Sequence, residues 1–405
     1  MIEAAERAAA LLAGRSAEIE AARRLPRDLA DGLAALGLMR LLTPRSCGGP
    51  ELHPAEFFRV VERVARADAS AAWCSFISST SALVAAWLPA GTAAPLFGRA
   101  HLKCAGVFAP RGRAAREGSG YVVSGRWAWG SGVQHADVVV VGCLVPGADG
   151  APEKTAAGAP RVLSVVVDAA HVKPLDNWTS FGLCGTGSGE FDIAPHWVPA
   201  ERTASMLDTP PVVDTALYRF PVFGLLALAI AATASGIARQ ALDAFVALAA
   251  SKVPQGSQRT LAQRPAVHEA LARAEAQWRA ARAFALEAVD EAWREAAADP
   301  APGASGTTGT TGTTGTPGTA RSAGTIGLQA RRDLRLAATH VAHGAAAVVD
   351  RVHALAGGDA IFAASPLQRC LRDVHVATQH LMVGEPTFEL AGRLLLGQPT
   401  DATLL

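Results

Sequence analysis

The first hundred residues carry hydrophobic positions at a helical period. Apolar residues recur three and four positions apart in segments rich in Ala, Leu and Glu. The predicted helices cover residues 3–23, 26–36, 54–66 and 69–87. Pro26 suits a helix start and Gly37 a helix stop. Residues 69–87 have almost no polar face, so we expect that helix to be buried between others. The pattern predicts an all-α domain over residues 1–100.

From about residue 103 the helical period gives way to alternation. Short runs rich in β-branched and aromatic residues are bounded by Gly and Pro at the intervals typical of a small barrel or sandwich. The predicted strands cover residues 102–108, 121–124, 138–141, 162–167 and 190–193. Residues 146–160 are polar and predict an exposed loop. We therefore predict a middle β domain over residues 101–210.

After Pro221 the helical period returns in much longer segments. The predicted helices cover residues 223–251, 266–298, 326–355, 366–383 and 389–396. Long helices joined by short links are typical of a bundle. The chain therefore predicts an α+β fold with an N-terminal all-α domain, a middle β barrel or sandwich, and a C-terminal four-helix bundle over 211–405.

One segment of the predicted bundle follows neither pattern. Residues 303–320 consist mainly of Gly and Thr and contain no apolar side chain large enough to anchor them in a core. We predict that about 300–324 form a disordered loop between two helices. The simplest interpretation is a neutral insertion.

Composition narrows the function classes. The 405 residues carry a formal net charge of +1 and no long Lys or Arg block, so we expect no nucleic-acid partner. The six cysteines are scattered without a Cys-x-x-Cys pair, and no clustered His or carboxylate motif is present, so we expect no metal site. The most apolar run, 220–234, is shorter than the ~20 residues of a membrane span. We expect a cytoplasmic protein without a membrane partner.

The loop at 125–137 is the first candidate for chemistry. It lies between two predicted strands and holds two tryptophans, a serine, a histidine and several glycines, which is more than a simple turn requires. Glycines let a backbone approach a flat ligand closely, and tryptophans supply planar apolar walls. The loop is therefore a candidate wall for an aromatic cofactor. The alternative is a hairpin whose tryptophans fill the core.

The order of domains resembles the acyl-CoA dehydrogenase superfamily. The segments that carry this resemblance are 125–137, 178–188, 198–202, 354–359 and 367–373. They are similar, in order, to the family's Trp-x-Thr/Ser flavin motif, its Gly-Thr-Gly-Ser segment, the Val-Pro end of the β domain, the Gly-Gly turn and the Arg-x-x-Arg-Asp run. The resemblance extends over almost the whole chain.

The resemblance implies a flavin, FAD or FMN. Trp129 would lie along the isoalloxazine and Ser131 near its N5 and O4 edge. The segment Thr186-Gly187-Ser188 would supply hydroxyl donors and exposed backbone N–H groups.

Three further residues would bind the flavin by resemblance. Gly357 and Gly358 would face its nucleotide part across a subunit interface of a homotetramer. Arg259 would bind the pyrophosphate, although the Phe-Gly that follows this Arg in the family is absent here.

The C-terminal motif supports two alternative interpretations of the catalytic residues. Residues 372–380, Arg-Asp-Val-His-Val-Ala-Thr-Gln-His, resemble the two-component flavin monooxygenases, which receive reduced flavin from a separate reductase. In such an enzyme His375 and Ser131 would be the catalytic residues. His380 is the second candidate for the catalytic histidine. Five positions separate His375 from His380 on the predicted helix, so at most one of these histidines lines the site. In an acyl-CoA dehydrogenase Glu385 would be the base instead, but the Tyr and Gly that flank the family's Glu are replaced here.

The resemblance favours an oxidoreductase that hydroxylates a small aromatic or polyketide-like substrate through a flavin C4a-hydroperoxide. The residues expected to contact the substrate are Phe108, His135, Trp178, Phe181 and His380. The alternative is an acyl-CoA dehydrogenase that oxidises an acyl thioester with FAD. A flavin-free relative that binds a partner is a third possibility, because fold does not establish activity.

Overall fold

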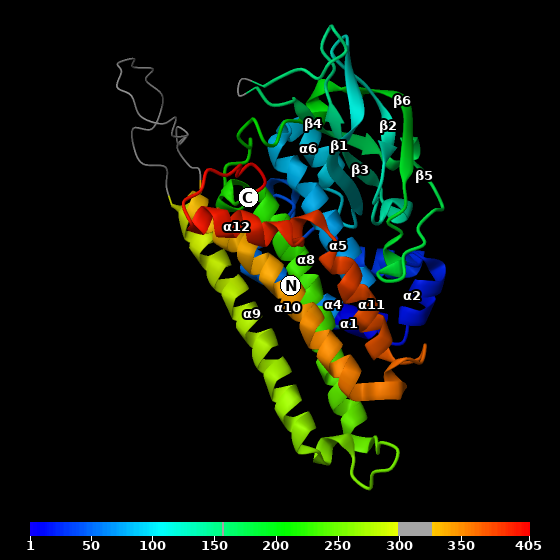
Figure 1. Cartoon of the computed structure of the whole chain (residues 1–405). Coiled ribbons are helices and arrows are strands. Elements are labelled where there is room, and N and C mark those ends of the chain that lie inside the picture. The colour runs from blue at the N-terminus through cyan, green and yellow to red at the C-terminus, as the bar shows by residue number, and fades with distance from the viewer. Residues whose placement is uncertain (156–157, 299–325) are drawn as a thin grey trace.

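The computed structural model describes residues 1–155, 158–298 and 326–405. Figure 1 shows a β sheet at one end of the molecule and long helices that extend away from it. Along the chain, short helices come first, strands second and long helices last. This is the predicted α+β order. The loop predicted at 300–324 lies outside the described residues. The predicted domain limits, 1–100, 101–210 and 211–405, stay predictions.

One of the N-terminal helices, α5 (Ala69–Ser81), is buried between α4 (Pro54–Ala65), the sheet and the later helix α8 (Val222–Ser251). The other N-terminal helices are α1 (Ile2–Leu12), α2 (Ser16–Ala22), α3 (Arg27–Ala35) and α6 (Ala90–Phe97). Asp68 caps α5, because its Oδ1 accepts the N–H of Ala71 at 2.9 Å. Almost all of α5 is buried, as its lack of a polar face predicted. The segment ends in a 3-10 turn, η2 (Ala82–Trp87), which continues α5 in a tighter form.

The middle of the chain forms one seven-stranded sheet with the order β5-β6-β2-β1-β3-β4-β7. The strands are β1 (Cys104–Glu117), β2 (Gly120–Trp127), β3 (Val138–Leu144), β4 (Val162–Asp168), β5 (Lys173–Pro174), β6 (Phe191–Pro199) and β7 (Thr203–Ala204). The pair β1–β3 is parallel and the other pairs are antiparallel.

Alternate residues of the central strands enter two different cores. Val138 and Val140 of β3 pack against the helices, whereas Val139 and Val141 face a separate core within the β domain. That second core contains Trp127, which is fully buried and donates from Nε1 to the carbonyl of Gly142 at 2.9 Å. Trp127 is therefore a packing residue, and the β domain has a hydrophobic core of its own.

The C-terminal helices form the predicted bundle around α8. After the short α7 (Ala216–Arg219) come α8 (Val222–Ser251), α9 (Pro265–Ala297), α10 (Leu328–Ala356), α11 (Pro366–Thr378) and α12 (Pro386–Leu395). Figure 1 shows α8, α9 and α10 side by side along the long axis, with α11 beside α8 and α10. The helix predicted at 366–383 ends earlier, at Thr378, and the chain then forms a 3-10 turn, η9 (Leu381–Val383).

Two segments are long and apolar enough to cross a membrane by composition alone. They are residues 69–87 and α8, and 94% and 78% of their most apolar windows are buried inside the fold. Other helices and the sheet cover them, so their apolar character is explained by core packing.

Candidate functional site

A chain of buried hydroxyl groups lies where the sheet meets α5. Ser131, in the loop after β2, has its Oγ 2.6 Å from the Oγ of Ser188. The Oγ of Ser188 is in turn 2.7 Å from Oγ1 of Thr186, which donates to the carbonyl of Leu183 at 2.8 Å. From the other side, Nε1 of Trp73 on α5 donates to Ser131 Oγ at 3.2 Å. The structure thus brings together three of the predicted flavin residues.

Backbone contacts between two glycine-rich loops hold this chain of hydroxyls in place. Gly132 donates its N–H to the carbonyl of Thr186 at 3.0 Å, and Gly130 donates to that of Gly189 at 2.9 Å. Gly187 has φ +60°, and a Cβ there would lie 2.4 Å from Oε1 of Gln134. Any side chain at position 187 would therefore displace Gln134, whose Nε2 donates to the Gly187 carbonyl at 2.6 Å.

Large aromatic side chains beside this cluster are exposed to solvent. Trp129 is 68% exposed and has φ +61°, a left-handed conformation that is uncommon for a residue other than glycine. Phe181 is 61% exposed. Trp178 is half-buried and donates from Nε1 to the Leu183 carbonyl at 3.3 Å. Exposed aromatic rings next to buried hydroxyls are typical of a binding surface for a flat ligand.

Two histidines lie close to the hydroxyl cluster. The ring of His380 lies 5.9 Å from that of Trp73, and its Nδ1 accepts the N–H of Met382 at 3.2 Å. Burial, aided by the Arg335 guanidinium, lowers the pKa of His380 to about 4. His135 lies under the loop close to Gly132, and burial lowers its pKa to about 4 as well. Both imidazoles are therefore neutral at pH 7.

The neutral state of His380 has one defined tautomer. Because Nδ1 accepts a hydrogen bond from a backbone N–H, the ring proton is on Nε2. Among the described residues no group accepts a hydrogen bond from that Nε2–H. His380 therefore presents a hydrogen-bond donor.

The two remaining predicted catalytic residues, His375 and Glu385, make their described polar contacts with α10, and Phe108, a predicted substrate contact, lies on β1. Nε2 of His375 is 2.8 Å from Oδ1 of Asp350 on α10, and the His375 side chain is 42% exposed. Glu385 precedes α12, is 77% exposed and lies 3.4 Å from Nδ1 of His343. Phe108 on β1 is half-buried against the helical core. Their roles at the site stay predictions.

The residues predicted to bind the nucleotide part of a flavin form a separate group. Gly357, with φ +59°, and Gly358 follow α10, and Arg259 lies in the loop between α8 and α9. Lys252 joins the two connections, because its Nζ donates to the carbonyl of Ala356 and lies 3.0 Å from Asp359. Figure 1 shows the α8–α9 connection at the end of the bundle that is far from the sheet. A single chain thus carries two separate halves of the predicted cofactor site.

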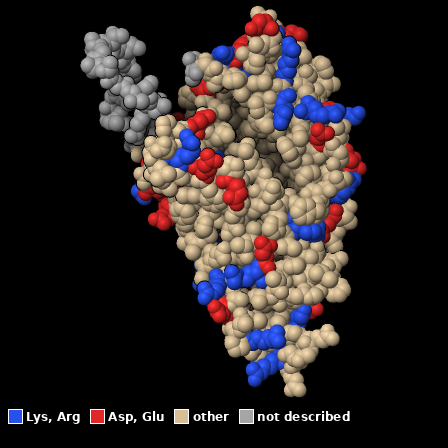
Figure 2. Space-filling model, viewed as in Figure 1, with Lys and Arg blue, Asp and Glu red and all other residues tan. Residues whose placement is uncertain are grey.

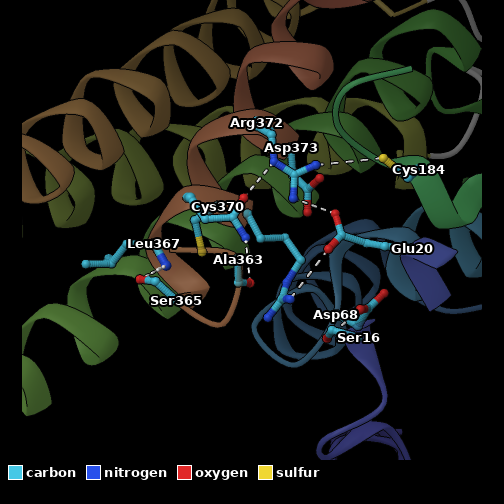
Figure 3. Close-up of polar contacts among 12 residues, drawn as sticks. Ser16, Glu20, Asp68, Cys184, Ala363, Ser365, Leu367, Cys370, Arg372 and Asp373 are labelled. Carbon is cyan, nitrogen blue, oxygen red and sulfur yellow. Dashed lines mark hydrogen bonds and ion pairs between the residues drawn. The ribbon is translucent and has the colours of Figure 1, made fainter. Parts of the chain in front are cut away.

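Asp373 and Arg372 of α11 hold the loop that carries the hydroxyl cluster. Oδ1 of Asp373 accepts the N–H of Leu183 at 2.6 Å. Arg372 donates to the carbonyl of Phe181 and pairs with Glu20 of α2 at 2.6 Å. Figure 3 shows Arg372 directed toward both Glu20 and Cys184. Arg372 and Asp373 were identified from the sequence as part of a family motif, but their contacts with the 181–184 loop were not predicted.

Asp373 is a strongly perturbed carboxyl group. Its burial raises its pKa to about 7, and the nearby Asp68 and Glu20 act in the same direction, against the Leu183 amide and Arg372. Asp68 is itself buried, which raises its pKa, and accepts from Ser16 Oγ at 2.9 Å. Figure 3 shows Ser16, Asp68 and Glu20 on the N-terminal helices, near Asp373 on α11. The loop is therefore anchored on an acidic cluster that joins two domains.

These features fit the flat, edge-polar ring of a flavin. Trp129 and Phe181 offer apolar surface. The hydroxyl of Ser131 supplies a polar contact for the ring edge. Nδ1 of His135 is buried without a partner among the described residues, as expected for a group that a ligand completes. Figure 2 shows a mostly uncharged hollow between the sheet and the helices.

Comparison with known proteins agrees with this geometry. Residues 3–94 match the family model of the acyl-CoA dehydrogenase N-terminal domain, and residues 228–385 match that of the acyl-CoA dehydrogenase C-terminal domain. The chain is 30% identical over 387 residues to indole-3-acetate monooxygenase of Pseudomonas putida, covering 95% of this chain and 90% of that protein. It is 28% identical to the oxygenase subunit HsaA of a flavin-dependent monooxygenase of Rhodococcus jostii, covering 90% of each.

Solved structures show the same fold. The 3-HSA hydroxylase from Rhodococcus sp. RHA1 superposes with a TM-score of 0.85 at 23% identity, covering 100% of this chain and 98% of that one. XiaF from Streptomyces sp., solved with FADH2 and glycerol, gives 0.83 at 23% identity and covers 98% and 95%. The predicted fold class and family resemblance are confirmed. The chain therefore belongs to the acyl-CoA dehydrogenase superfamily, within its branch of flavin-dependent monooxygenases, which are oxidoreductases.

Proposed function

We propose that this chain is the oxygenase component of a two-component system that hydroxylates a small aromatic substrate, with reduced FAD or FMN delivered by a separate reductase. The observation that carries the proposal is the buried Ser131–Ser188–Thr186 cluster beside the exposed rings of Trp129 and Phe181. The related proteins act on indole-3-acetate in Pseudomonas putida and resorcinol in Rhizobium sp., by their names. Both compounds are aromatic, which supports the substrate class.

Each residue of the site has a proposed task. When bound, reduced flavin supplies the electrons that activate molecular oxygen. Trp129 packs on the ring, and the Ser131 hydroxyl contacts its polar edge, held by Ser188 and Thr186. The Nε2–H of His380 donates to the substrate oxygen as charge develops on it. The substrate space is proposed to be lined by Phe181, Trp178, Phe108 and His135. Their aromatic rings would pack on an apolar ligand and exclude water from it.

Labelled dioxygen tests this function. Under anaerobic conditions the purified protein should bind reduced FAD or FMN. Addition of labelled molecular oxygen and an aromatic acid or phenol should then give a product that carries one labelled oxygen atom. Mass spectrometry of the product is the measurement. A tightly bound oxidised FAD that acyl-CoA thioesters bleach would contradict the proposal and indicate the dehydrogenase reaction instead.

Replacing Glu385 with Gln should change hydroxylation by less than about twofold, as for most exposed positions. The Glu385 side chain is 77% exposed, and its described contact is from Oε1 to Nδ1 of His343 at 3.4 Å. Steady-state product formation by wild type and E385Q is the comparison. A loss of more than tenfold would return Glu385 to the role of base that the dehydrogenase alternative assigns to it.

A homotetramer is part of the proposal. The α8–α9 connection, which contains Arg259, lies at the end of the bundle far from the sheet, and Lys252 ties it to Ala356 and Asp359 on either side of Gly357 and Gly358. A flavin that contacts both this group and the hydroxyl cluster needs a second chain to supply one of them. Light scattering after size exclusion would give the mass of the assembly directly.

A further inference from the structure

The hydroxyl chain at Ser131 has a fixed donor at one end and a fixed acceptor at the other. The indole Nε1 of Trp73 can only donate, and it donates to Ser131 Oγ at 3.2 Å. The carbonyl of Leu183 can only accept, and it accepts from Thr186 Oγ1 at 2.8 Å. Between them the three hydroxyls of Ser131, Ser188 and Thr186 are linked by contacts of 2.6 and 2.7 Å.

Counting protons gives the direction of every bond. Thr186 has a single hydroxyl proton and uses it on the Leu183 carbonyl, so it accepts from Ser188. The proton of Ser188 is then committed to Thr186, so Ser188 accepts from Ser131. Ser131 therefore has no proton left for a ligand. What its Oγ offers outward is a lone pair, since one oxygen accepts up to two hydrogen bonds and Trp73 supplies one.

The acceptor end of the chain is held firmly. Leu183 has φ +48°, and its carbonyl also accepts the N–H of Thr186 at 3.1 Å and Nε1 of Trp178 at 3.3 Å. Its own N–H donates to Asp373 at 2.6 Å. The two peptide units that flank the Leu183 Cα are therefore both held, and the carbonyl stays directed at the Thr186 hydroxyl.

We propose that this directed chain of hydroxyls makes the site selective for reduced over oxidised flavin, which rests on the proposed function. On reduction, N5 of the isoalloxazine changes from a hydrogen-bond acceptor to an N–H donor. A reduced ring edge can donate to the lone pair of Ser131. An oxidised ring edge meets acceptor against acceptor, and Ser131 becomes a donor to it only when its proton leaves Ser188 or when all three hydroxyls reverse; either change breaks one hydrogen bond of the chain. Reversal breaks the Thr186–Leu183 bond and sets those two oxygens against each other at 2.8 Å.

The size of the selectivity follows from that single bond. One hydrogen bond corresponds to about a tenfold change in an equilibrium constant. Thr186→Val removes the hydroxyl that fixes the direction while keeping the shape of the side chain. The ratio of the dissociation constants for oxidised and reduced flavin should then fall about tenfold. For a two-electron couple this lowers the potential of the bound flavin by about 30 mV.

The test compares anaerobic binding of oxidised and reduced FAD and FMN to wild type, T186V and T186S. We expect the ratio of dissociation constants to fall in T186V and to return in T186S, which restores the hydroxyl. Ser188→Ala is the second variant, and it should lower the ratio too, because the Ser131 proton is then free to turn outward. Near-UV circular dichroism verifies folding of each variant.

The results of this test distinguish a failure of the selectivity mechanism from a failure of the monooxygenase proposal. A wild-type ratio in both T186V and S188A overturns the selectivity mechanism while leaving the monooxygenase proposal intact, since reduced flavin still binds. Wild-type protein that binds neither redox form overturns both. An equal loss of affinity for the two forms, with no change in their ratio, would assign these hydroxyls to general support of the loop and also overturn the mechanism.

Discussion

Replacing His380 with Ala is expected to lower the rate of substrate hydroxylation about 100-fold, while reduced flavin binds almost as in wild type. Loss of one preorganised donor to a developing charge typically costs on the order of 100- to 1000-fold in rate. His380 supplies such a donor, because its Nδ1 is occupied by the Met382 N–H and its Nε2 carries the proton. Its ring lies beside Trp73, the residue that donates to Ser131.

The measurement for H380A is product formed per reduced flavin consumed in a single turnover. Oxygen consumption should continue while the yield of hydroxylated product falls. H375A is the matched control, because His375 comes from the same region but pairs with Asp350 at the surface. We expect H375A to stay within about twofold of wild type. A large loss of product yield in H375A with little change in H380A would instead identify His375 as the catalytic histidine, as the sequence predicted.

The pH profile gives a second readout for His380. Since the pKa of this imidazole is lowered to about 4, its neutral form predominates at every pH above about 5. The hydroxylation rate should therefore show no loss from this group between pH 6 and 8. An acid limb centred near pH 6.5 that disappears in H380A would contradict the assignment of a neutral donor.

The sequence predicted the position of a strand even where both of its faces are buried. Residues 138–141 form a strand whose alternate side chains enter two cores. Val138 and Val140 pack into the helical core, and Val139 and Val141 into the core of the β domain. The second half of β1, residues 109–117, was not predicted. Its Gly112 lacks a side chain because Trp127 occupies that space, where a Cβ would lie 2.0 Å from the indole. A cross-strand fit of this kind leaves no periodic signal in the sequence.

The choice between His375 and His380 depended on where a helix ends. A helix through residue 383 places the two histidines on partly shared faces, but α11 ends at Thr378. His380 begins the next turn, accepting the Met382 N–H as its N-cap. The apolar spacing continues across this break, so periodicity alone does not reveal it.

Long-range partners of the site were beyond the reach of the sequence. Ser131, Thr186 and Ser188 were predicted from their resemblance to family motifs, and the structure brings them together. Trp73 lies in a nearly apolar helix, where an indole is indistinguishable from core packing. Leu183 has no chemical signature, because it acts through its backbone. Only the folded chain brings such residues together.

Replacing Asp373 with Asn should change how stability depends on pH. The pKa of Asp373 is raised in the folded protein from an ordinary value near 3.8 to about 7. Between these values the folded state binds more protons than the unfolded state, so the free energy of unfolding falls as pH rises. Above about pH 7 the loss is complete and amounts to at most about 4 kcal/mol. Relative to wild type, D373N should therefore gain stability between pH 4 and 8.

Urea unfolding of wild type and D373N at a series of pH values measures this difference. Parallel stability curves for the two proteins would contradict a perturbed carboxyl at position 373. S180A is a useful control, because the hydroxyl that it removes lies in the same loop and its described hydrogen bonds are to Gly182 within that loop. Its stability curve should run parallel to that of wild type.

A carboxyl group that destabilises the fold when ionised still strengthens the site. The charged form of Asp373 is a better acceptor for the Leu183 N–H than the neutral form or an Asn amide, because charge-assisted bonds are stronger. Hydrogen exchange at the Leu183 amide, corrected for its intrinsic pH dependence, should therefore slow in flavin-free wild type as pH rises through 7. D373N should lack that added protection even where it is the more stable protein overall. Opposite trends in global stability and local protection would distinguish a residue that holds the flavin loop from one that merely fills the interface between α11 and α2.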